Sequence, residues 1–71
     1  MAFPQVGPHM QVSDFYVRRE ARRLIERSGD EALAEARATF LKCRARDDEL
    51  AADTWLRIVA QIAEMVRERA T

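Results

Sequence analysis

The positions of proline and glycine limit most strongly what this chain can fold into. Both prolines, Pro4 and Pro8, and one of the two glycines, Gly7, lie among the first twelve residues. Proline cannot donate a backbone hydrogen bond and glycine favours turns, so residues 1–12 are predicted to form an extended arm. Residues 13–71 are expected to form a single helical domain, in which Gly29 is the one glycine and a natural stop for a first helix.

The origin of the arm is left open between two alternatives. Residues 7–10 are Gly-Pro-His-Met, a string typical of a protease-cleavage and cloning scar. The natural chain then starts at Met10, and residues 1–10 are partly vector-derived. The alternative is a native arm.

A first helix is predicted over residues 13–28. Ser13 and Asp14 are good N-cap residues, because their side-chain oxygens accept hydrogen bonds from free backbone N–H groups. Successive residues of a helix are about 100° apart, and this spacing places five residues on one narrow face of the first helix. That face consists of Val17, Ala21, Leu24, Ile25 and Ser28. Phe15 and Tyr16 lie off this face, either under the arm or exposed.

A second helix is predicted over residues 30–46, with Asp30 as its cap. Its main apolar stripe consists of Leu33, Ala36, Phe40 and Cys43. A second stripe consists of Ala34, Ala38, Leu41 and Ala45. A helix that packs against one neighbour needs only one apolar stripe. Because this helix has two, we expect the second stripe, which consists mostly of small residues, to form a second contact surface.

The third helix, over residues 48–69, is predicted to be the central element. Its start rests on Asp47 and Asp48, which are good cap residues, although neither Gly nor Pro marks the break. Its apolar residues from Ala51 to Val66 cover about half of the circumference, wider than the stripe of a helix with one neighbour. The prediction is an all-α fold, a small three-helix bundle of antiparallel neighbours. If the chain does not break at Asp47 and Asp48, the second and third helices form one long helix, which pairs with the first helix as a hairpin.

Composition excludes several classes of protein. Cys43 and His9 are the only cysteine and histidine, so neither an internal disulfide nor a usual zinc site is expected. No phosphate-binding loop or nucleophile motif is present, and we expect no enzyme activity and no cofactor. No apolar run has the about 20 residues of a membrane span, and a lone cysteine fits the cytoplasm. Trp55 and Cys43 are predicted to belong to the core.

A basic cluster on the first helix gives the alternative function, a small regulator that contacts nucleic acid. The cluster consists of Arg18, Arg19, Arg22, Arg23 and Arg27. The whole chain, however, carries 12 basic and 12 acidic residues, without the basic surplus that phosphate binding demands. Glu20 and Glu26 lie beside the arginines, and we interpret the cluster as a solvated surface.

The surplus apolar surface leads to the preferred prediction, a protein-interaction module or non-catalytic accessory subunit. A chain of 71 residues has a marginal core, and with disulfides and metals excluded a second chain is the remaining supplement. The protein is expected to homodimerise or to dock on a larger protein. The candidate contact residues are Phe15, Ala34, Ala38, Leu41, Ala45 and Leu56.

Two segments of the chain resemble a family of small helical proteins from alphaproteobacteria. Residues 21–32 read ARRLIERSGDEA and residues 47–58 read DDELAADTWLRI. They are similar to the family's Arg-Leu-Ile helix end before Gly-Asp and to its Trp-x-Arg-Ile segment. Family members often have His where this chain has Ser28. The resemblance implies a compact helical fold and no known activity.

Overall fold

The computed structural model describes residues 12–70, and every element within them is helical. Helix α1 comprises Asp14–Ser28, a 3₁₀ turn η2 comprises Gly29–Glu31, α2 comprises Ala32–Ala45 and α3 comprises Glu49–Ala70. The all-α prediction is confirmed. The expectation of three separate helices is met only in part, because η2 joins α1 directly to α2. Residues 14–45 therefore form one bent helical run, and 49–70 form a second.

Helix α1 begins where its cap residue predicts. The Ser13 side chain accepts a hydrogen bond from the backbone N–H of Tyr16 at 3.2 Å. Asp14 occupies the first turn and Arg27 the last, which places each charge favourably against the helix dipole. The helix then buries Val17, Ala21 and Leu24, the centre of the predicted stripe.

The corner between α1 and α2 differs from the prediction. Gly29 has a φ of 55° and a ψ of −123°, outside the left-handed helical region expected for a helix stop. Asp30 does not cap α2, because it lies inside the 3₁₀ turn, and no side chain caps this helix. Glu35 of α2 holds the corner instead, by accepting hydrogen bonds from Ser28 Oγ at 2.9 Å and from Arg27 at 3.4 Å.

The break between α2 and α3 lies where it was predicted, and its geometry explains why no glycine is needed. The Asp48 N–H donates to the Cys43 carbonyl and the Asp47 N–H to the Arg44 carbonyl, both at 3.0 Å. This pair of bonds is a Schellman motif, which requires a positive φ at the residue after the helix. Asp47 supplies it with a φ of 60°, a conformation that aspartate tolerates. Asp48 then caps α3 by accepting the Ala51 N–H at 3.2 Å.

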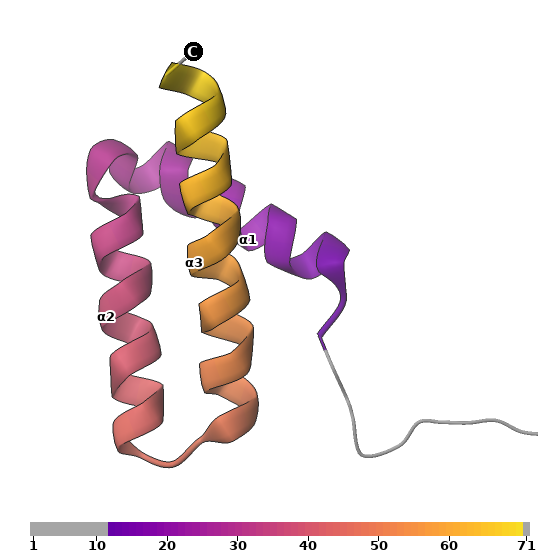
Figure 1. The fold of residues 1–71 in the computed structure, drawn as a ribbon, viewed down its shortest axis with the longest axis vertical. Helices are drawn as coiled ribbons and strands as arrows, with labels where there is room; N and C mark the ends of the chain where they lie inside the picture. Colours follow the sequence, from indigo (N-terminus) through magenta and orange to yellow (C-terminus); the bar gives the residue numbers. More distant parts are fainter. Residues whose placement is uncertain (1–11, 71) are drawn as a thin grey trace, which may run out of the picture.

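Helices α2 and α3 lie side by side as an antiparallel hairpin (Figure 1). Helix α1 crosses obliquely behind the hairpin and packs more extensively on α3 than on α2. The prediction of antiparallel neighbours is therefore correct for α2 and α3 and wrong for α1 and α2. The 3₁₀ turn redirects the chain at the corner, so α1 covers one side of the hairpin.

The core lies between α1 and the side of the hairpin that it covers. Ile58 and Ile62 of α3 are its largest fully buried residues. Val17, Ala21 and Leu24 of α1 and Ala32 and Ala36 of α2 complete the cluster. Trp55 is partly buried against this core, as predicted for a tryptophan at this spacing. Cys43 is buried as a free thiol.

Candidate protein-interaction surface

In the described part of the chain few large apolar side chains are fully buried, and most of the partly buried ones, such as Trp55 and Val59, pack against the core. Four large apolar residues are buried, namely Val17, Leu24, Ile58 and Ile62. The other buried apolar residues are Cys43 and four alanines. Six are exposed: Phe15, Tyr16, Leu41, Leu50, Leu56 and Val66. Exposed apolar surface on this scale typically marks a contact surface.

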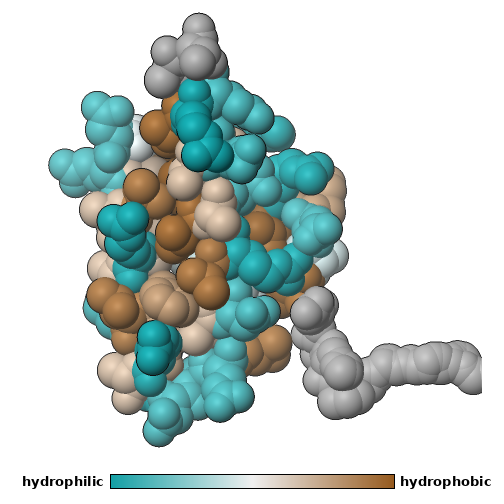
Figure 2. All heavy atoms as spheres, in the orientation of Figure 1, coloured by the Kyte–Doolittle hydropathy of each residue, from teal (hydrophilic) through white to brown (hydrophobic). Residues whose placement is uncertain are grey.

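Part of this apolar surface gathers on the side of the hairpin that α1 leaves uncovered. Figure 2 shows hydrophobic residues along this side, in the view in which α1 lies behind the hairpin. Helical spacing places Leu56, Val59, Ala60 and Ala63 along one side of α3. We call this surface the hairpin face; its residues are Leu33, Phe40 and Leu41 of α2 with Leu56, Val59, Ala60 and Ala63 of α3.

The depressions on the other side of α3 confirm which side α1 covers. One depression joins Val12 and Tyr16 to Ala51, Thr54 and Trp55. Another joins Arg22 and Ile25 of α1 to Met65 of α3. Neither contains a residue of the hairpin face.

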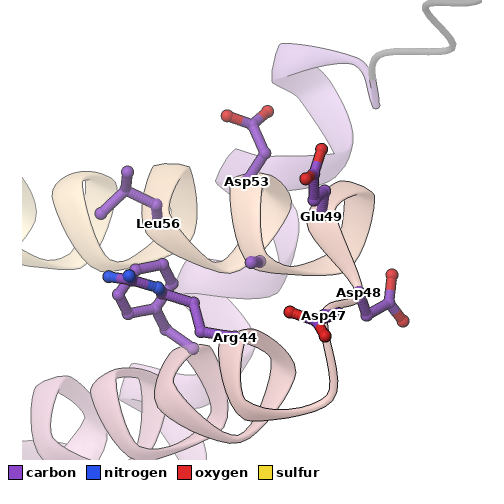
Figure 3. A pocket seen from close by; sticks show the side chains of 8 residues that line it. Arg44, Asp47, Asp48, Glu49, Asp53 and Leu56 are labelled. Carbon is purple, nitrogen blue, oxygen red and sulfur yellow. The ribbon is translucent and has the colours of Figure 1, made fainter.

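The lower end of the hairpin face contains a groove between α2 and α3. The groove has a volume of about 420 Å³ and includes Phe40, Arg44, Ala52 and Leu56. The guanidinium carbon of Arg44 lies 5.8 Å from the centre of the Phe40 ring, a cation–π distance. Figure 3 shows the Arg44 side chain extending beneath Leu56, whereas Asp53 and Glu49 point to the side of α3 away from α2. The groove therefore combines three apolar residues, Phe40, Ala52 and Leu56, with five charged ones, Arg44, Asp47, Asp48, Glu49 and Asp53.

The structure separates the predicted contact residues into three groups. Leu56 is 50% exposed at the end of the hairpin face that contains the groove, and Leu41, 58% exposed, lies where this face meets the outer side of α2. Ala34, Ala38 and Ala45 are exposed on the outer side of α2, opposite its buried residues Ala32, Ala36 and Cys43. Alanine favours helix formation by itself, so their presence on an outer side does not require a partner.

Phe15 lies apart from the other predicted contact residues, in the first turn of α1. It is 71% exposed, and the guanidinium carbon of Arg19 lies 5.9 Å from its ring centre. Its neighbour Tyr16 lines the depression beside Trp55. The first turn of α1 is thus a separate apolar surface and not part of the hairpin face.

The predicted basic surface of α1 is exposed, but its charges are partly paired. All five arginines are exposed. Arg23 lies 3.5 Å from Glu20, Arg27 lies 3.4 Å from Glu35, and Arg19 lies over Phe15. Helical spacing spreads the five around the exposed side of α1, so they do not form one compact patch.

Sequence reasoning missed Arg57, which links α3 to the start of α1. Its guanidinium donates to the backbone carbonyl of Val12 at 2.6 Å and to the carboxylate of Asp14. The Arg57 side chain is 26% exposed. Helical spacing places Arg57 on the polar side of α3 beside Asp53 and Glu64, so the sequence pattern carried no signal that identifies its partner.

The described residues show no site for metal chemistry or membrane crossing. No group of three or more His, Cys, Asp or Glu side chains among residues 12–70 has an arrangement that could hold a metal ion. His9 lies outside the described residues. None of the helices in this part of the chain combines the length and the apolar character that crossing a membrane requires.

Comparison with known proteins gives no match. No protein-family model matches the chain. Neither a curated protein nor a solved structure matches it significantly. The resemblance to the alphaproteobacterial family therefore stays a prediction, and the function must be argued from the surface itself.

Proposed function

We propose that this protein is an interaction module without chemistry of its own, which binds another protein chain through the hairpin face. The observation that carries the proposal is the distribution of large apolar side chains, four buried and six exposed in residues 12–70. Burying apolar surface contributes about 25 cal/mol per Å². A partner that covers Phe40, Leu41 and Leu56 therefore adds stabilisation that the alanine-rich core lacks.

The hairpin face has the composition of a contact surface. Its centre contains Phe40, Val59 and Leu56, which are half-buried or half-exposed and held on two rigid helices. Arginine and acidic residues border it, as in interfaces with an apolar centre and a polar rim. Helix faces of this kind bind partner helices through apolar residues spaced by three and four.

Site-specific photo-crosslinking in cells of the source organism tests the proposal. A benzoylphenylalanine at position 56 keeps a large apolar side chain in the hairpin face and forms a covalent adduct with any chain in contact. The matched control is the same residue at position 26, because Glu26 is exposed on α1 opposite its buried stripe.

We expect adducts heavier than the 8.2 kDa chain from position 56 and none from position 26. Double the chain mass indicates a second copy, and any other mass indicates a different protein. Equal yields of adduct at both positions, or none at position 56, would contradict the proposed function.

A further inference from the structure

We infer that the partner of the hairpin face is a second copy of this chain, packed with its α3 antiparallel to α3 of the first about a two-fold axis near Ala60. The inference rests on the proposed function and specifies its partner. Three features of α3 support it: the equal spacing of Asp53 and Arg67 from Ala60, the small residues Ala60 and Ala63 beside Leu56, and the exposure of this side of the helix.

The open side of α3 carries Glu49 and Asp53 near the start of the helix and the ion pair of Glu64 with Arg67 near its end. Asp53 and Arg67 are each seven residues from Ala60, or about 10 Å along the axis. A two-fold axis at Ala60 therefore brings Asp53 of each copy to the level of Arg67 in the other, and both pairs are attractive.

The same axis places Leu56 beside small residues of the partner helix. In the antiparallel arrangement Leu56 of one copy, four residues before Ala60, reaches the level of Glu64 in the other, four residues after it, with Ala60 and Ala63 alongside. Leu56 is half exposed, and Ala60 and Ala63 leave room for it between the turns of the partner helix. Interlocking of this kind is how antiparallel helices of a bundle pack.

The charged residues are available for these contacts. Asp53 has no ion-pair partner within residues 12–70. Arg67 pairs with Glu64 at 3.3 Å, but both side chains are mostly exposed, 72% and 56%. Such a surface pair contributes little, so Arg67 can exchange Glu64 for the partner's Asp53 at small cost. A parallel arrangement would instead bring like charges together, which disfavours it.

Sedimentation equilibrium of the full chain with charge-reversal variants tests the inference. The wild-type chain is expected to sediment at twice its 8.2 kDa mass as its concentration rises. Asp53→Arg and Arg67→Glu should each weaken self-association about tenfold or more, because each places like charges at both symmetric contacts. Circular dichroism of both variants controls for folding, since both positions are exposed.

Restoration by charge exchange is the decisive result. Mixing Asp53→Arg with Arg67→Glu should give a heterodimer in which both pairs are attractive again, and the double variant should regain self-association. A wild-type chain that stays monomeric while position 56 cross-links to a different protein would overturn this inference and leave the proposed function intact. Single variants that associate as tightly as the wild type would overturn the antiparallel arrangement.

Discussion

At Gly29 the backbone has a φ of 55° and a ψ of −123°, a combination that residues with a Cβ rarely adopt. A Cβ added there would meet no atom within 4 Å. Gly29→Ala is therefore expected to lower the free energy of unfolding by about 1–2 kcal/mol through backbone strain alone. Urea unfolding followed by circular dichroism measures this loss.

Asp47 provides the matched control for Gly29, because its φ of 60° is also positive but is occupied by a residue with a Cβ. Asp47→Gly removes that strain and should raise the free energy of unfolding slightly, by about 0.5 kcal/mol after the entropy of the unfolded chain is considered. If Gly29→Ala lowers the free energy of unfolding and Asp47→Gly raises it, the backbone conformation at these positions is the cause of both changes. A neutral Gly29→Ala would show that the corner relaxes to another geometry.

These two residues also show what local sequence signals can and cannot predict. Ser13 and Asp48 cap their helices as their residue types predict, because a cap depends on atoms within three residues. The direction of the corner at Gly29 does not depend on local signals alone. It also depends on Glu35, seven residues beyond Ser28 along the chain, and sequence patterns carry no information about that contact.

At the scale of the elements, Arg57 fixes where the first turn of α1 lies on α3. It binds the Val12 carbonyl and Asp14, residues 45 and 43 positions away in the chain. Arg57→Ala removes both contacts, and hydrogen bonds from charged groups contribute about 1.5–3 kcal/mol when they are shielded from water. We expect backbone amides at the start of α1 to exchange with solvent about tenfold faster in this variant, as measured by hydrogen–deuterium exchange.

Arg23→Ala is the control for Arg57→Ala. Arg23 forms one ion pair with Glu20 within its own helix, and its side chain is 69% exposed. Exposed pairs of this type contribute about 0.3–0.5 kcal/mol, so exchange at the start of α1 should hardly change. If both variants accelerate exchange equally, the effect comes from the helix itself and Arg57 does not position α1.

The stripe patterns of the helices predicted burial better than they predicted packing. Val17, Ala21 and Leu24 of α1 and Ile58 and Ile62 of α3 are buried as their spacing indicates. The broad apolar side of α3 was also recognised. Which part of it α1 covers was not predictable, because the oblique crossing depends on the corner at Gly29. The candidate contact residues are all exposed, but Phe15 lies on α1 and the three alanines lie on the outer side of α2, apart from Leu56.

At the scale of the whole molecule, the small core and the uncovered hairpin face predict different responses to truncation. Ile62 is fully buried and is one of the two largest residues in the core, whereas Leu56 is half exposed. Ile62→Ala should lower the free energy of unfolding by about 2–4 kcal/mol at every protein concentration, because it removes buried methyl groups and leaves a cavity.

Leu56→Ala should act only where chains associate. At concentrations low enough to keep the chain monomeric, the loss of an exposed side chain is expected to change the free energy of unfolding by no more than about 0.5 kcal/mol. At high concentration, the proposed association is expected to stabilise the folded wild-type chain and raise its Tm, and Leu56→Ala should remove that rise. Thermal unfolding of both variants across a wide concentration range measures the difference. An equal loss for Leu56→Ala and Ile62→Ala in dilute solution would mean that Leu56 already stabilises the isolated chain, and the hairpin face would then need no partner.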